Sequence, residues 1–172
     1  MRKVLFIFGQ LTDTDIEWLA KAGRRKRLPA NTVLIHEGGR VETLYIVLEG
    51  ELVVAQGAKA REIARLGVGE IVGEMSFIDA RPPSATVRAA SDVVVFAIPR
   101  ATLEQGLASN IAFAARFYKA VATFLSDRVR LATAGEQGLD RDKADELDDA
   151  VLDNVDRAGA RFDALGRLLL DG

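Results

Sequence analysis

The stretch GEMSFIDARPPSATV, residues 73–87, lies within a run of short apolar segments that are separated by glycine. Gly73 is followed by Glu74–Ile78, the only part of this region that suits a short helix. The first turn of a helix exposes backbone N–H groups with no partner inside the helix, so we expect an anion site at this point. Pro82 and Pro83 then stiffen a loop that leads into the next strand.

Short β segments surround this stretch and are divided by turn-forming residues. No helical segment of comparable length lies between them, which favours an antiparallel sandwich or roll over a parallel sheet. The predicted strands are Thr32–His36, Thr43–Glu49, Glu51–Gln56, Arg61–Leu66, Ala85–Ala89 and Asp92–Ile98. The basic run Arg24–Arg27 is interpreted as the solvated start of a further strand, where positive charge protects an exposed sheet edge.

Helices are predicted on both sides of the β region. Thr12 suits a helix cap with Asp15 three residues later, and Gly23 ends that helix. After Pro99 the chain is predicted to be helical except for an interruption at residues 135–138. The apolar positions of the first long helix are Ile111, Ala115, Tyr118, Val121, Leu125, Val129 and Ala132. Those of the last helix are Leu147, Val151, Val155, Ala158, Phe162, Leu165 and Leu169, and their spacing approaches a heptad seam.

Composition excludes several classes of protein. The 172 residues contain no cysteine and one histidine, so neither a disulfide framework nor a thiolate or histidine-rich metal centre is expected. No apolar stretch approaches the length of a membrane span, and the apolar run after Met1 is shorter than a signal sequence requires. We therefore expect a cytoplasmic protein whose first residues pack on the domain. The segment after residue 134 is acidic, which disfavours nucleic acid as its partner.

The motif at residues 73–87 resembles the phosphate-binding cassette of the cyclic nucleotide-binding domain family. That cassette has the pattern Gly-Glu, an apolar residue and a small residue, then a loop and Pro-Arg-(Ala/Ser)-Ala-(Thr/Ser)-Val. The resemblance runs from about Leu5 to Arg130 and includes Leu28–Leu34 and Leu44–Val54. It implies an eight-stranded antiparallel β-roll with a short cassette helix and long C-terminal helices, divided into a domain at 1–134 and a helical tail at 135–172.

The resemblance also implies a ligand site. In the family, the glutamate meets the ribose hydroxyl and the arginine pairs with the cyclic phosphate, which assigns the first role to Glu74. Pro83 stands where the arginine is expected, and proline offers neither a charge nor an N–H group. The donors left are the Ser84 hydroxyl, the N–H groups of Ser84 and Ala85, and Arg81 if it turns inward. The predicted ligand-binding residues are Gly73, Glu74, Met75, Ser76, Arg81, Ser84, Ala85 and Thr86.

Two functions are therefore open. The first is a stand-alone regulatory module that senses cyclic AMP, cyclic GMP or a related phosphorylated ligand weakly and signals through its C-terminal helices. The second is a dimeric scaffold that keeps the fold and has lost the ligand. Neither is an enzyme or needs a metal or cofactor, and the acidic tail lacks the basic DNA-binding module of the family's transcription factors. The Ile111–Ala132 stripe predicts a homodimer in both cases.

Overall fold

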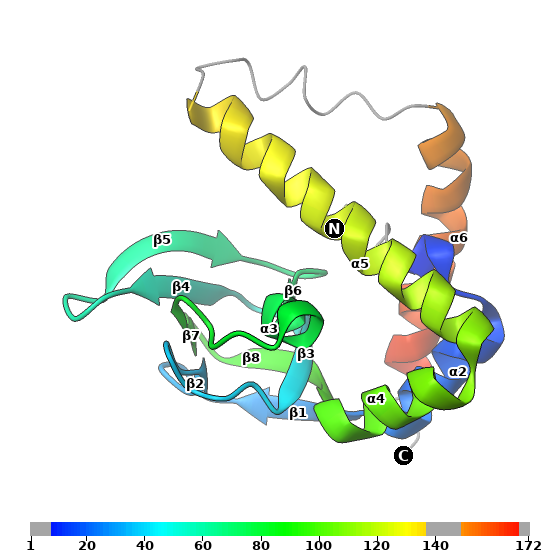
Figure 1. Ribbon diagram of the computed structural model, residues 1–172, viewed down its shortest axis with the longest axis horizontal. Helices are drawn as coiled ribbons and strands as arrows, with labels where there is room; N and C mark the ends of the chain where they lie inside the picture. Colours follow the sequence, from blue (N-terminus) through cyan, green and yellow to red (C-terminus); the bar gives the residue numbers. More distant parts are fainter. Residues whose placement is uncertain (1–7, 137–148, 169–172) are drawn as a thin grey trace.

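The computed structural model describes residues 8–136 and 149–168, in which two four-stranded antiparallel sheets form a roll flanked by helices (Figure 1). One sheet has the strand order β1-β8-β3-β6 and the other β2-β7-β4-β5. The strands are β1 (Arg24–Leu28), β2 (Val33–Ile35), β3 (Thr43–Glu49), β4 (Leu52–Gln56), β5 (Arg61–Leu66), β6 (Ile71–Val72), β7 (Thr86–Ala89) and β8 (Val93–Pro99). The helices are α2 (Asp13–Ala22), α3 (Glu74–Asp79), α4 (Arg100–Ser109), α5 (Ile111–Glu136) and α6 (Asp149–Leu168).

The first sheet is covered on both faces, which explains why β8 is apolar at every position from Val93 to Ile98. Val93 and Val95 face the other sheet and pack in a cluster with residues of both sheets. Phe96 and Ile98 point the opposite way and pack with the helices. Successive side chains of a strand alternate between faces, so a strand buried on both sides needs apolar residues throughout.

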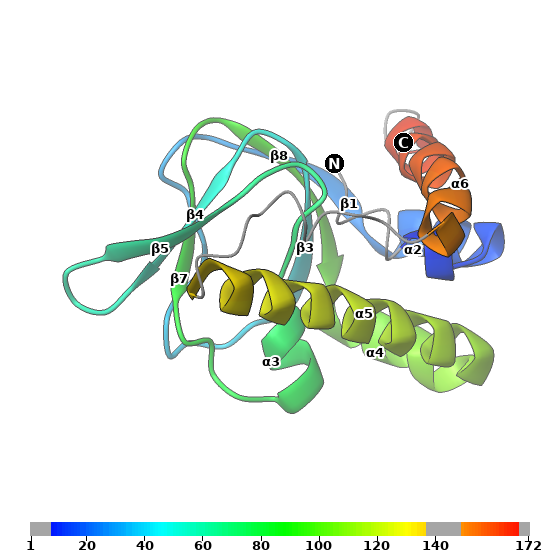
Figure 2. The ribbon, with the colours of Figure 1, turned by 90° about the horizontal axis from the view of Figure 1, so that it is seen from above.

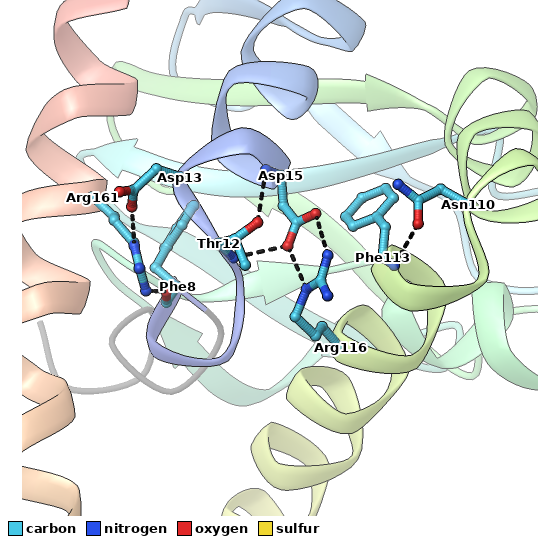
Figure 3. Close-up of polar contacts among 8 residues, drawn as sticks. All are labelled: Phe8, Thr12, Asp13, Asp15, Asn110, Phe113, Arg116 and Arg161. Atoms are coloured by element: carbon cyan, nitrogen blue, oxygen red, sulfur yellow. Dashed lines mark hydrogen bonds and ion pairs between the residues drawn. The ribbon is translucent and has the colours of Figure 1, made fainter.

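The helix α2 is fixed at its start by a capping box. The Thr12 hydroxyl accepts the Asp15 N–H at 3.3 Å, and the Asp15 carboxylate accepts the Thr12 N–H at 2.8 Å. The same carboxylate receives two hydrogen bonds from Arg116 of α5, at 2.7 and 2.9 Å. Asp15 therefore joins the beginning of α2 to α5 (Figure 3).

The last helix, α6, packs on α2 of the same chain. Ala158 and Leu165 are fully buried in the cluster that also holds the helical side of the first sheet. Arg161 donates to Asp13 at 2.6 Å and to the carbonyl oxygen of Phe8 at 3.1 Å (Figure 3). The apolar stripe predicted for this helix thus contacts its own chain at these positions, while Leu147 and Leu169 lie outside the described residues.

The eight-stranded roll and its flanking helices are confirmed, with three additions. The segment Arg24–Leu28 is a complete edge strand that pairs with β8, and Ile71–Val72 forms a further short strand, β6, too short for a periodic pattern. The helical region after Pro99 is also broken at Asn110, between α4 and α5. The Asn110 side chain accepts the N–H of Phe113 at 3.0 Å, so this asparagine starts a new helix.

None of the helices in the described part of the chain has both the length and the apolar character that crossing a bilayer requires.

Candidate functional site

The predicted cassette begins at a sharp turn between β6 and α3. Gly73 has a φ of +93°, and a Cβ atom at this position would lie 2.9 Å from the carbonyl oxygen of Thr43. A residue with a side chain would be strained at this φ and would also collide with the backbone, so glycine is required. The turn directs the first residue of α3, Glu74, into the molecule, where it is 2% exposed.

The buried carboxylate of Glu74 is paired with a residue of the long helix. Nη1 of Arg128 in α5 lies 2.5 Å from Oε1 of Glu74, and the two side chains are 27% and 3% exposed. The Arg128 guanidinium also lies over the ring of Phe124, 5.3 Å from its centre. Burial raises the pKa of Glu74 above its usual range and Glu70 raises it further, while the charge and hydrogen bond of Arg128 oppose the rise.

A second arginine anchors the cassette helix. Arg100, the first residue of α4, donates to the carbonyl oxygen of Ser76 at 2.9 Å and to the Glu104 carboxylate at 2.7 Å. Its guanidinium lies 5.5 Å from the ring centre of Phe77, which in turn meets Phe117 of α5 edge to face at 5.8 Å. The helix α3 is therefore held by both α4 and α5, which the views of Figures 1 and 2 place beside it.

The loop after α3 is pinned through its backbone. The Pro83 carbonyl oxygen accepts the Gly38 N–H at 2.8 Å, and the Ser84 carbonyl oxygen accepts Nε2 of Gln56 at 3.1 Å. Arg81 does not turn inward: its side chain is 83% exposed, and its Nε lies 3.8 Å from the Asp79 carboxylate. The cation that the family pattern places in this loop is thus not replaced by Arg81.

The predicted site residues differ in their surroundings. Ser76 and Ala85 are buried, at 6% and 8% exposed, whereas Met75 is 57% exposed. The Thr86 hydroxyl accepts the Glu37 N–H at 3.1 Å, and Ser84 is exposed. These assignments remain predictions. In the described residues, no group of three or more histidine and acidic side chains could hold a metal ion.

Arg128 is the residue of this site that the sequence analysis did not single out. It follows Phe124 by four residues and so continues the buried face of α5 that contains Phe113, Phe117 and Phe124. A charged residue on the buried face of an otherwise apolar helix is a signal that a partner lies opposite. The sequence contains this signal, but it does not identify Glu74 as the residue that pairs with Arg128.

Known proteins share part of this sequence. An uncharacterized NTE family protein of Mycobacterium tuberculosis is 30% identical over 119 residues, which is 69% of this chain and 20% of that protein. The cAMP-activated global transcriptional regulator CRP of Salmonella typhimurium is 32% identical over 82 residues, 45% of this chain and 39% of that protein. The chain therefore spans a fifth to two fifths of the length of these relatives.

Among solved structures, a cyclic nucleotide-binding domain from Methylobacillus flagellatus superimposes with a TM-score of 0.67 at 26% identity. The match covers 74% of this chain and 77% of that one. The sequence pattern of the cyclic nucleotide-binding domain matches residues 25–110, from β1 to the end of α4. With the roll, the cassette turn and the buried glutamate in place, the chain belongs to the cyclic nucleotide-binding domain family.

Proposed function

We propose that this chain is a non-catalytic regulatory module whose cassette holds the ribose of a cyclic nucleotide or a related phosphorylated ligand, with weak affinity. The observation that carries this proposal is the pairing of Glu74 with Arg128 of α5. A ribose hydroxyl that donates a hydrogen bond to Glu74 would bind the same carboxylate that forms the ion pair with Arg128. Ligand binding would therefore act directly on the contact between the cassette and the long helix.

The affinity for a cyclic phosphate should be low because the cassette lacks its arginine. Hydrogen bonds to a charged partner contribute about 1.5–3 kcal/mol each, so the loss of guanidinium pairing corresponds to roughly ten- to a hundredfold in affinity. Pro83 stands at that position and Arg81 is directed to Asp79. The cAMP-activated regulator of Salmonella typhimurium supports a nucleotide as the class of ligand to test first.

The route from the cassette to the helices runs through two contacts. Arg128 joins Glu74 to α5, and Phe77 packs edge to face on Phe117 of the same helix. A ligand shifts α5 only if it binds two arrangements of this helix with different affinity. Displacing Arg128 from Glu74 would provide that difference.

We also propose that the chain forms a homodimer through α5. This helix buries one apolar face on its own domain, yet Ile111, Tyr118 and Val129 on another side are 83%, 46% and 61% exposed. Ala115 and Ala122 are exposed as well. These five residues recur at intervals of four, three, four and seven residues, which places them on one side of the helix, while Leu125 is half-buried against its own domain. Val121 is 2% exposed and packs on its own domain, so it does not belong to this stripe.

A dimeric scaffold without a ligand is the second candidate. Pro83 at the phosphate position favours it, because a roll that has lost its ligand has no further need of the arginine. The exposed stripe of α5 would serve such a scaffold equally well.

The test is a titration of the full chain with cyclic AMP, cyclic GMP and cyclic dinucleotides by calorimetry, followed by hydrogen exchange with each ligand that binds. We expect micromolar or weaker binding, with altered exchange in both Glu74–Ile78 and Ala115–Ala132. Glu74→Ala should abolish the response, whereas Glu62→Ala, which removes an exposed carboxylate of β5, should retain it. Protection confined to the cassette would contradict coupling, and no change with any nucleotide would favour the scaffold.

A further inference from the structure

The outer edge of the first sheet carries a run of positive charge. This edge is formed by β1, which has the sequence RRKRL at residues 24–28 and lies along the lower side of the roll in Figure 1. It pairs with β8 on one side, and within residues 8–136 and 149–168 its backbone forms no hydrogen bond besides those of this ladder. An edge strand directs every second N–H and C=O group away from its sheet, so β1 presents donors and acceptors to a further strand.

Most of the cations of β1 are not used inside the described chain. Arg25 turns back over the sheet to Glu49 of β3, with Nη2 2.7 Å from Oε1. Arg24, Lys26 and Arg27 are exposed, and with the residues that the structure describes none of them forms an ion pair or a side-chain hydrogen bond. Since successive side chains of a strand alternate between faces, these three cations lie on both faces of the edge.

The charge of this edge discriminates between possible occupants. A second copy of β1 is unfavourable, because like charges opposite each other destabilise a strand pair. An acidic strand places carboxylates beside cations that have no counter-ion in the described residues, so its charge is complementary. Nucleic acids and anionic lipids also carry negative charge, but neither supplies the peptide N–H and C=O groups that extend a sheet.

We propose that β1 is a docking site for an extended acidic peptide segment of another protein, which adds to the first sheet as a further strand. Main-chain hydrogen bonds to the edge provide affinity, and contacts of the carboxylates with Arg24, Lys26 and Arg27 select acidic sequences. The residues of β1 belong neither to the cassette nor to the exposed stripe of α5. The docking site is therefore independent of the proposed function.

Fluorescence anisotropy of the full chain with the labelled peptide Thr-Val-Glu-Glu-Glu-Glu-Val-Thr tests the proposal. We expect saturable binding that weakens as the salt concentration rises, because exposed charges are screened. A reference peptide in which all four glutamates are N-methylated keeps the charge and loses four N–H donors. It should bind the unaltered protein about tenfold or more weakly, because main-chain hydrogen bonds to the edge are lost.

Two matched variants locate the site. Lys26→Glu combined with Arg27→Glu reverses two exposed charges of β1 and should weaken binding of the unmethylated peptide by about tenfold or more. Lys59→Glu combined with Arg61→Glu makes the same change of charge at exposed residues at the start of β5, an edge strand of the other sheet, and should leave the affinity unchanged. Circular dichroism checks that both variants keep the fold.

Several results would overturn the proposal. Absence of binding by the wild-type chain would exclude the docking site, and equal binding of the methylated and unmethylated peptides would show attraction by charge without strand addition. Tighter binding of single-stranded oligothymidylate, or of vesicles of phosphatidylcholine and phosphatidylserine, would identify another class of partner. An equal loss of affinity in the β5 variant would show that β1 is not the site.

Discussion

Glu74 combines two opposing influences on its charge. Its side chain is 3% exposed, which disfavours the ionised form, while Arg128 at 2.5 Å favours it. Burial is the larger effect, so the pKa of Glu74 is raised. A carboxyl group with a raised pKa binds its proton more tightly in the folded than in the unfolded chain, which makes its contribution to stability depend on pH.

The sign of this dependence gives a first prediction. The contribution of Glu74 is complete below the ordinary carboxyl value of 4.5 and is lost as the pH rises through the higher pKa of the folded state. The unfolding free energy of the wild type minus that of Glu74→Gln, measured by urea denaturation, should therefore fall across this window. Each unit by which the pKa is raised corresponds to about 1.4 kcal/mol.

Glu17→Gln is the matched control, because Glu17 is an exposed carboxylate of α2. Its substitution should change the unfolding free energy by less than about 0.5 kcal/mol. If the difference between the wild type and Glu74→Gln instead grows with pH, the attraction of Arg128 outweighs burial and the assignment is wrong.

Three helices meet at the start of α2, and their contacts position α5 relative to the roll. Asp15 is 4% exposed and holds both its own capping box and Arg116 of α5. Burial by itself would raise the pKa of Asp15, but the hydrogen bonds of Arg116 and Thr12 together outweigh it, so the pKa is lowered. On the other side, Asp13 is 82% exposed and pairs with Arg161 of α6.

Asp15→Asn should destabilise the protein at neutral pH by about 1–3 kcal/mol, because it weakens hydrogen bonds that a buried charge receives. Asp13→Asn makes the same chemical change two residues away, at an exposed ion pair, and should cost less than about 1 kcal/mol. Urea denaturation at neutral pH measures both.

The pH dependence of Asp15 has the opposite sign to that of Glu74. A lowered pKa gives stability that is present above the ordinary value of 3.8 and is lost as the pH falls through the pKa of the folded state. The difference between the wild type and Asp15→Asn should therefore shrink in acid. If Asp15→Asn and Asp13→Asn lowered the unfolding free energy at neutral pH by the same amount, the contact between α2 and α5 would not depend on the buried Asp15 carboxylate.

At the scale of the whole molecule, the described residues form two buried apolar clusters, one between the sheets and one between the first sheet and the helices. The exposed stripe of α5, formed by Ile111, Ala115, Tyr118, Ala122 and Val129, belongs to neither cluster. Because α6 packs on α2 instead, it leaves this stripe uncovered in the described chain (Figures 1 and 2). An apolar stripe along an exposed helix is typical of an interface.

Charged substitutions in this stripe should dissociate the dimer. Tyr118→Glu combined with Val129→Glu should give a monomer in sedimentation velocity at micromolar concentration, with an unchanged fold because both side chains are exposed. Ile63→Glu introduces a single negative charge at an exposed apolar residue of β5 and should leave the dimer intact. A monomeric wild-type chain under these conditions would contradict the proposed interface.

Local patterns were sufficient for much of the fold. The capping box of Thr12 and Asp15, the strand Thr43–Glu49 and the short helix after Gly73 all follow from residues close in sequence, and the structure confirms them. The break at Asn110 was missed because the apolar periodicity continues across it, and a single capping side chain marks the new helix. The two-residue strand β6 was missed because strand periodicity needs a longer segment.

The contacts that shape the candidate site have a different origin. Glu74 and Arg128 are 54 residues apart and Asp15 and Arg116 are 101 residues apart, so each pair exists only once α5 lies across the roll and α2. The sequence shows that a carboxylate and a guanidinium are present, but their burial and mutual distance depend on how the helices pack. The apolar spacing of α6 likewise permits either a coiled coil or packing on α2. In the structure Phe162 and Leu165 lie in the same cluster as residues of α2, so α6 packs on α2. Short-range hydrogen bonding and periodicity are properties of neighbouring residues, whereas partner choice between distant segments is a property of the packed chain.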